Sequence, residues 1–253
     1  MNRHKYVLKF IFLATLLIIS QKKASAQTGW RIGADAGGLI SRTFVNDTTN
    51  DNYKKKYYAG YRTGLNLSWG KSEMNGFSLA FHYVDKGIRY QLLTNDSLNT
   101  IGQVRMGSKF LEIPFCMYFK QDLGISGFVR ENFGLGGAFQ LTKYDSLRTK
   151  SKVGDFEGVN TRSTQFNAFF RLGIEVGNRF ANGDLLTFGV HYQQGFGTVS
   201  TQNFNSPAKN INYFNTRFNG SYIGVNLGYH FNLTNIGARE EFFTKNINKT
   251  ILY

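Results

Sequence analysis

An alternation of apolar and polar residues recurs about eight times along this chain, and this pattern constrains the fold most. One clear copy covers residues 166–177, FNAFFRLGIEVG, and another covers residues 221–231, SYIGVNLGYHF. A period of two places the apolar side chains on one face of a β-strand and the polar side chains on the other. In an exported protein, strands of about ten residues with this pattern predict a transmembrane β-barrel.

The N-terminal segment 1–26 predicts export. It begins with basic residues, continues with the apolar stretch Phe10–Ile19, and ends on the small residues ASA at 24–26, a pattern that signal peptidase reads. The apolar stretch is too short to span a bilayer, which needs about 20 residues. We therefore expect a signal peptide that is cleaved before Gln27. Its removal takes away five of the 30 Lys and Arg residues and none of the 16 Asp and Glu residues, so the formal net charge falls from +14 to +9.

Eight strands are expected, joined by connections that alternate in length. The strands cover residues 30–42, 57–69, 77–92, 103–119, 124–141, 164–178, 185–199 and 218–231. Short connections at 70–76, 120–123 and 179–184 alternate with long loops at 43–56, 93–102, 142–163 and 200–217. Short turns on one side and long loops on the other are typical of outer-membrane barrels, whose turns lie in the periplasm.

The sequence thus predicts an all-β protein, an eight-stranded antiparallel up-and-down transmembrane β-barrel over residues 27–231. An even number of strands places both termini in the periplasm of a Gram-negative cell. Residues 232–253 are expected to form a periplasmic C-terminal extension, for which a short helix and a flexible segment are both open.

The composition of the two strand faces decides which face points inward. A soluble lipocalin-like barrel would place bulky apolar side chains inside and polar ones outside. Here the apolar face is bulky and aromatic, whereas the other face is rich in glycine with scattered charges. Glycine and a few long charged side chains fit the narrow interior of an eight-stranded barrel. The aromatic face is therefore expected to contact lipid.

Three segments resemble a known family. Residues 109–120, KFLEIPFCMYFK, are similar to the YLEIPLLLKY-type strand of the outer-membrane β-barrel domain of Bacteroidota, often called the PorT family. Residues 186–196, LTFGVHYQQGF, resemble the penultimate strand of that family, and residues 224–231, GVNLGYHF, resemble its closing LGYRF strand, with His230 in place of arginine. The resemblance implies an outer-membrane barrel. Because the name-giving member is linked to secretion of cargo, it also implies an alternative role in a protein secretion complex.

Charged residues on the glycine-rich face predict a structural ion-pair network inside the barrel. Glu112, Arg130, Arg171 and Glu175 fall on neighbouring strands, and Arg62 lies on the same inner face. A buried charge is costly unless it is paired, so opposite signs on neighbouring strands are expected to pair. We expect replacement of Glu112 by alanine to leave an arginine unpaired. The functional alternative is a polar conduit or gate, although eight strands leave little lumen for a porin-like pore.

The three histidines on the polar face are the candidate catalytic groups. His82, His191 and His230 lack a serine or aspartate at a telling spacing, so no catalytic residue, metal site or cofactor is expected. His191 and His230 lie on adjacent expected strands, where they could meet. That arrangement leaves open the alternative of a small barrel hydrolase acting on lipid A or peptide.

Basic residues in the long loops predict contacts with anionic lipid. These lysines are Lys54, Lys55, Lys56, Lys143, Lys150 and Lys152. They could pair with the phosphates of lipopolysaccharide, while an ordinary solvated loop is the competing interpretation. An exported chain rarely meets nucleic acid, so outer-membrane lipid, lipopolysaccharide and envelope proteins are the expected partners. The sequence favours a structural or surface-binding role without catalysis.

Overall fold

The computed structural model describes residues 29–41, 53–70, 75–93, 100–142, 147–151, 154–206 and 211–233. The predicted signal peptide 1–26 and the tail beyond residue 233 lie outside the described residues. The strands are β1 (Gly29–Ser41), β2 (Tyr53–Lys56), β3 (Tyr58–Gly70), β4 (Asn75–Leu93), β5 (Thr100–Leu123), β6 (Gly127–Gln140), β7 (Leu147–Ser151), β8 (Gly154–Ser163), β9 (Phe166–Arg179), β10 (Leu185–Gly195), β11 (Ser200–Ser206), β12 (Ile211–Phe218) and β13 (Tyr222–Asn232).

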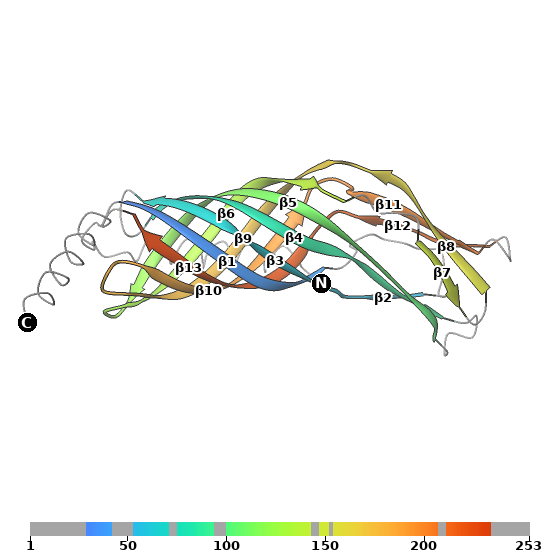
Figure 1. Ribbon diagram of the computed structural model, residues 1–253, viewed down its shortest axis with the longest axis horizontal. Helices are drawn as coiled ribbons and strands as arrows, with labels where there is room; N and C mark the ends of the chain where they lie inside the picture. Colours follow the sequence, from blue (N-terminus) through green and yellow to red (C-terminus); the bar gives the residue numbers. More distant parts are fainter. Residues whose placement is uncertain are drawn as a thin grey trace, which may run out of the picture.

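Eight of these strands close into an antiparallel barrel, which confirms the predicted fold (Figure 1). Around the barrel the order is β1, β3, β4, β5, β6, β9, β10 and β13, and β13 pairs with β1 to close the sheet. Apart from the closing β13–β1 pair, each pairing joins two strands that follow each other in this order along the chain, so the topology is up-and-down. The start of β1, where Arg31 lies opposite Asn232, adjoins the end of β13. We call this end of the barrel, which also carries the β5–β6 and β9–β10 turns, the turn end, and the opposite end the sheet end.

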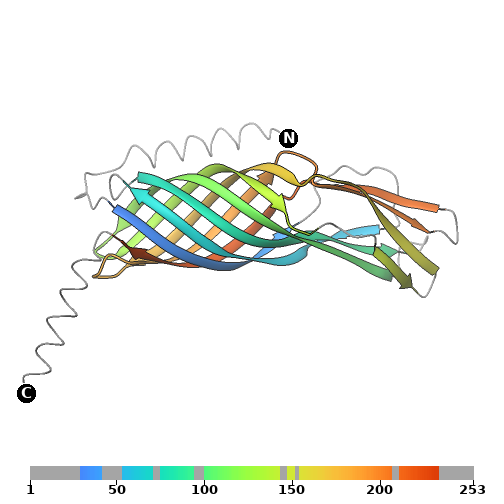
Figure 2. The same ribbon diagram turned by 45° about the horizontal axis from the view of Figure 1, so that its top comes forward.

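The long connections at the sheet end differ from the loops that the sequence predicted. β2 continues the line of β3 and pairs with β4, and β7, β8, β11 and β12 form a separate four-stranded sheet. Figure 2 shows these strands continuing beyond the barrel. The alternation was too weak to reveal them because segments such as STQNFNS of β11 are polar on both faces. Their strand conformation comes from pairing with a neighbouring strand.

The outer surface of the barrel is apolar, as predicted. Leu65, Leu135 and Ile174 expose 58%, 60% and 54% of their surfaces on β3, β6 and β9. Residues of the opposite parity on the same strands, such as Arg62 and Asn66, are buried inside. An apolar outside and a polar inside are the reverse of a soluble barrel and suit a hydrocarbon surrounding.

Aromatic side chains mark both ends of this apolar surface. At the turn end the ring of Trp69 lies 6.4 Å from the ring of Trp30 and is stacked on Phe77. Toward the sheet end Tyr61 and Tyr83 pair at 6.1 Å on β3 and β4. Two aromatic zones separated by aliphatic side chains are the arrangement that membrane interfaces favour. Among the described residues, no helix has the length and apolarity that crossing a membrane would require.

The lumen toward the sheet end is filled by side chains. A buried apolar cluster occupies it and consists of Leu39, Val84, Ile88, Tyr90, Met106, Phe110, Ala138, Phe169, Val199, Phe218 and Tyr222. Glycine on the inner face makes room for such bulky groups. At Gly224, for example, an added Cβ would lie 2.6 Å from the ring carbon Cε1 of His191. Packing of this kind is expected in an eight-stranded barrel, whose interior side chains fill the available width.

Candidate functional site

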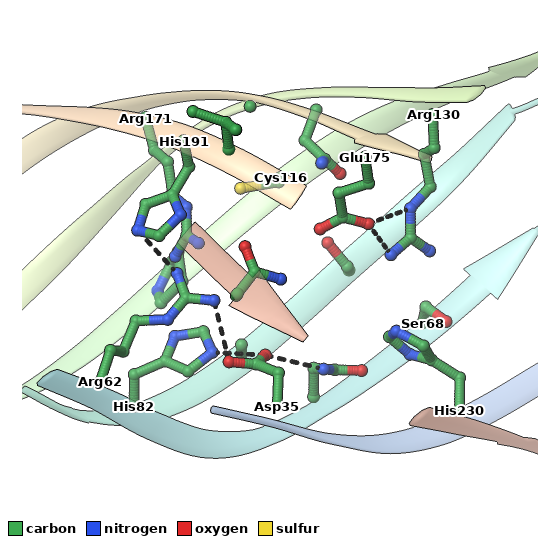
Figure 3. A pocket seen from close by; sticks show the side chains of 18 residues that line it. Asp35, Arg62, Ser68, His82, Cys116, Arg130, Arg171, Glu175, His191 and His230 are labelled. Atoms are coloured by element: carbon green, nitrogen blue, oxygen red, sulfur yellow. Dashed lines mark hydrogen bonds and ion pairs between the residues drawn. The ribbon is translucent and has the colours of Figure 1, made fainter. Parts of the chain in front are cut away.

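Between the apolar cluster and the turn end lies a polar cavity with about 50 Å³ of room for water (Figure 3). Four of the five residues predicted for the interior network line it: Arg62 of β3, Arg130 of β6, and Arg171 and Glu175 of β9. Asp35 of β1 lines it as well. These side chains meet because each occupies an inward position of a strand that wraps around the same stretch of lumen.

Asp35 is the centre of the largest set of contacts in the cavity. Its Oδ1 accepts a 2.8 Å hydrogen bond from Nη2 of Arg62. Its Oδ2 lies 3.0 Å from Nε2 of His82 and 3.1 Å from Nδ2 of Asn66. Arg62 reaches further across the lumen, where its Nη1 lies 3.1 Å from Nε2 of His191 on β10. The contacts of this carboxylate therefore connect three strands, β1, β3 and β4, and the contact of Arg62 with His191 connects them to β10.

A second ion pair joins Arg130 to Glu175. These residues lie directly opposite each other on β6 and β9. Nε of Arg130 donates a 2.8 Å hydrogen bond to Oε2 of Glu175, and Nη2 donates to the same oxygen. This is the one pairing that the structure forms among Glu112, Arg130, Arg171 and Glu175 within the described residues.

Glu112 lies outside the cavity, in a separate buried group. It is fully buried, and its Oε1 accepts hydrogen bonds from Nζ of Lys86 at 2.5 Å and from Nε2 of Gln193 at 2.8 Å. Its Oε2 accepts one from the hydroxyl of Tyr222 at 2.7 Å. The expectation that loss of Glu112 leaves an arginine unpaired is therefore wrong. The register places Glu112 opposite His82 and Ala138, nearer the sheet end than Arg130 and Arg171, and the cation that it contacts is Lys86.

Arg171 differs from Arg62 and Arg130 in its contacts. It is 8% exposed and lines the cavity, and its Nη1 has no hydrogen-bond partner among the described residues. The register sets it opposite Gly134 on β6 and Gln193 on β10, with no carboxylate directly across either pairing. The structure thus leaves this guanidinium apart from the predicted network.

The three histidines lie inside the barrel, as their position on the polar face predicted. His191 and His230 do not meet: on the β10–β13 pairing His191 is opposite Gly224, whereas His230 is opposite Leu185 at the turn end. The histidine beside a carboxylate is His82. Cys116 also lines the cavity, but no hydrogen bond joins its thiol to a histidine in the part of the chain that the structure describes.

No group of three or more His, Cys, Asp or Glu side chains suited to a metal ion occurs among the described residues.

A second candidate site lies on the outside, beyond the aromatic pair Tyr61–Tyr83. Lys56 of β2 lies opposite Arg89 of β4, and Arg89 lies opposite Arg105 of β5. All three side chains are exposed. We call Lys56, Arg89 and Arg105 the cationic row.

The other lysines predicted to contact lipid are placed less closely together. Lys54 is exposed on β2, while Lys55 is half-buried on the inner side with Tyr90 opposite. Lys150 occupies the register position opposite Asp155 where β7 pairs with β8. Lys143 and Lys152 lie outside the described residues. Only Lys56 of the predicted set therefore joins the row, whose other two members the sequence analysis missed.

The closed eight-stranded barrel, with its apolar outside and charged inside, defines the fold class of outer-membrane β-barrel proteins. The outer membrane protein OprG from Pseudomonas aeruginosa is similar, at 13% sequence identity and a TM-score of 0.50, with 82% of this chain and 98% of that chain covered. Neisserial surface protein A is similar at 12% identity and a TM-score of 0.44, with 82% and 99% covered. The outer membrane protein AlkL is similar at 12% identity and a TM-score of 0.36, with 84% and 95% covered.

At these identities the similarity to solved structures shows the fold alone. No protein-family model and no curated protein matches the chain.

Proposed function

We propose that this chain is an integral protein of the outer membrane that acts at the cell surface by binding anionic glycolipid, without catalysis. Both termini then lie in the periplasm, because β1 begins and β13 ends at the turn end, and the four-stranded sheet lies outside the cell. The apolar surface between the two aromatic zones supports insertion in a bilayer, since a soluble barrel would not leave side chains such as Leu65 exposed.

The observation that carries the proposal is the cationic row. Like charges directly opposite each other on neighbouring strands are destabilising, and here two such pairs stand side by side. A phosphate group placed against the row would remove that repulsion. Arginine suits this task because its planar guanidinium can donate two parallel hydrogen bonds to one phosphate.

The surroundings of the row fit an anionic lipid headgroup. Cζ of Arg105 lies 4.8 Å from the ring centre of Tyr58, and its Nη2 donates to the backbone oxygen of Ala59 at 3.3 Å. Nη2 of Arg89 donates to Oε1 of Gln103 at 2.7 Å. Both guanidinium groups are therefore held in place while they stay exposed. Between the row and the apolar surface lies Lys109, near Tyr83 and opposite Asp85, whose carboxylate offsets its charge.

The filled lumen argues against a conduit. The apolar cluster and the buried Lys86–Glu112 pair occupy the interior toward the sheet end, and the polar cavity holds only about 50 Å³. Opening such a lumen would require buried charges and aromatic rings to move together, which close packing disfavours. A surface role accounts for the structure more simply.

Lipid binding can be tested on the full barrel in detergent. Native mass spectrometry would measure retention of bisphosphorylated lipid A and of the same lipid after dephosphorylation. We expect the phosphorylated form to be retained preferentially, and the double variant Arg89→Gln/Arg105→Gln to lose most of that preference. Arg179→Gln, at the turn end, is the matched control because it removes one arginine without touching the row. Equal retention of both lipids by the unchanged protein would overturn the proposal.

A role in a protein secretion complex, as the PorT resemblance implies for this chain, is the second candidate. The four-stranded sheet supports it, because β7 and β12 are its edge strands in the described part of the chain. Sheet edges can accept a strand from another protein. Affinity isolation from gently solubilised membranes separates the two candidates, since a stoichiometric envelope protein would favour the complex and glycolipid alone would favour the surface-binding role.

A further inference from the structure

The charges that line the interior cavity do not balance. Three guanidinium groups face it, those of Arg62, Arg130 and Arg171, against the two carboxylates of Asp35 and Glu175. Arg62 is paired with Asp35, and Arg130 with Glu175, as described above. Arg171 is left as a positive charge in a buried space. An uncompensated buried charge is strongly unfavourable, so either a counter-charge or solvent must occupy this space.

The unpaired polar atoms around the cavity include three donors, besides the acceptor Oδ1 of Asn66 and the Nδ1 atoms of His82 and His230. Nε of Arg62 and Nη1 of Arg171 are buried without a hydrogen-bond partner among the described residues. Nδ1 of His191 is a third such atom. Arginine can only donate, so Nε2 of His191 must accept the hydrogen bond from Arg62. The ring proton of the neutral histidine is then on Nδ1, which makes this atom a donor too.

These three donors come from the same part of the cavity. Figure 3 shows Arg171, His191 and Arg62 on one side, while Arg130 and Glu175 lie on the other. β9 and β10 are paired neighbours on which Arg171 and His191 are diagonal, because Arg171 lies opposite Gln193 and His191 lies opposite Gly173. Arg62 of β3 reaches His191 across the lumen. Gly173 lies opposite His191 and lines the cavity, where it leaves space that a larger side chain would fill.

The cavity is small. Its 50 Å³ corresponds to roughly four water-sized positions, counting about 12 Å³ for each. This space admits a monatomic anion with one or two waters. Bulky organic anions do not fit.

We propose that the cavity binds a small monovalent anion, of the size of chloride, held by Arg171, Arg62 and His191. The anion neutralises Arg171 and accepts hydrogen bonds from the three donors. This site is independent of the cationic row on the outside of the barrel. It is a structural anion site of the interior, and occupancy couples halide concentration to the stability of the folded barrel.

Bromide locates the site directly in the unmodified protein. Crystals of the full barrel grown in sodium bromide are expected to show an anomalous difference peak in the cavity, within hydrogen-bond distance of Nη1 of Arg171. Fully ordered density without an anomalous signal would identify water and overturn the proposal. This measurement needs no variant, so it stands even where a substitution prevents folding.

Thermal unfolding in detergent gives the second test. A ligand that binds only the folded state raises the melting temperature, so we expect sodium chloride at about 0.15 M to raise it by about 3–6 °C over sodium gluconate at equal ionic strength. Arg171→Met, which keeps an unbranched but shorter side chain and removes the charge, should lose this difference. Arg105→Gln, on the outer surface, should retain it. A chloride effect of the same size in Arg171→Met would show that the salt acts elsewhere and would contradict the proposal.

Discussion

The Glu112 group and the polar cavity are both buried in the same barrel, yet they satisfy their charges to different degrees. Glu112 accepts three hydrogen bonds, and Lys86 also donates to the backbone oxygen of Gly220 and lies 4.6 Å from the ring centre of Phe110. In the cavity, by contrast, Asp35 and Glu175 are paired, but no ion pair joins Arg171 to a carboxylate among the described residues, and its Nη1 has no hydrogen-bond partner there. One group is closed by protein contacts, and the other has one cation more than its anions.

The difference follows from what surrounds each group. Around Glu112 the lumen is filled by Phe110, Phe169 and Tyr222, so no solvent is available and every polar atom of the carboxylate needs a protein partner. Around Arg171 the inner face carries Gly173, which lines the cavity opposite His191 and leaves room. Close packing therefore accompanies paired charges, although Oε1 of the neighbouring Gln193 has no hydrogen-bond partner among the described residues, whereas open space accompanies a surplus charge.

The largest effect is expected from Glu112→Ala. Removing this carboxylate leaves Lys86 buried without its counter-charge, so we expect the free energy of unfolding to fall by about 3–5 kcal/mol. Urea unfolding of the refolded barrel in detergent measures it. The double variant Lys86→Met/Glu112→Leu removes both charges and should lose much less. A double variant as unstable as the single one would show that the charge left on Lys86 is not the cause.

A smaller loss of stability is expected from Gly224→Ala, which tests the packing around the polar cavity. The added methyl group would lie 2.6 Å from Cε1 of His191 and displace this ring from Arg62. Overpacking of this kind costs about 1–3 kcal/mol. The control is Gly38→Ala, where an added Cβ meets nothing within 4 Å and stability should stay within about 0.5 kcal/mol. Equal urea midpoints for the two variants would mean that His191 is free to move.

Arg171→Met is expected to change stability in the opposite direction. In a buffer of gluconate without halide, removal of an uncompensated buried charge should raise the free energy of unfolding by about 1–2 kcal/mol. The same urea experiment measures it. A marked loss of stability would show that Arg171 is paired after all, and the contrast with Glu112 would then disappear.

The smallest effect on stability is expected from Arg89→Gln in the cationic row. Relief of repulsion from Lys56 and Arg105 and loss of the hydrogen bond to Gln103 oppose each other, so the change should stay within about 0.5 kcal/mol. Lipid retention should fall although stability does not. A destabilisation above 1 kcal/mol would place Arg89 among the structural charges instead.

The strands of the barrel could be predicted because each carries its own alternation. The predicted strand 164–178 nearly coincides with β9, and the predicted strand 218–231 covers nearly all of β13. The strands at the sheet end could not be predicted in this way, since β2 and β11 are polar and owe their conformation to a partner strand.

The members of the interior site could be predicted in part. Strand parity placed Arg62, Arg130, Arg171 and Glu175 inside, and the structure brings them to one cavity. The partner of Glu112 could have been found in the same way. Counting inward positions along β4 from His82 places Lys86 inside the barrel, where it contacts Glu112. Arg89 and Arg105 could not be recognised as neighbours from the sequence, because their proximity depends on the register of β4 against β5, which only the structure shows.

The period and the composition of the two faces, together with a predicted signal segment, were enough to predict a barrel with an apolar outside, because the face that a side chain occupies depends only on its position within a strand. Which cation meets which anion depended on the folded barrel. In a closed barrel, partners come from strands far apart in the chain, as Arg62 and His191 do, and their level is set by the stagger of every strand between them. That stagger is a property of the whole sheet, and it determined that Glu112 is fully paired while Arg171 is left for a small anion.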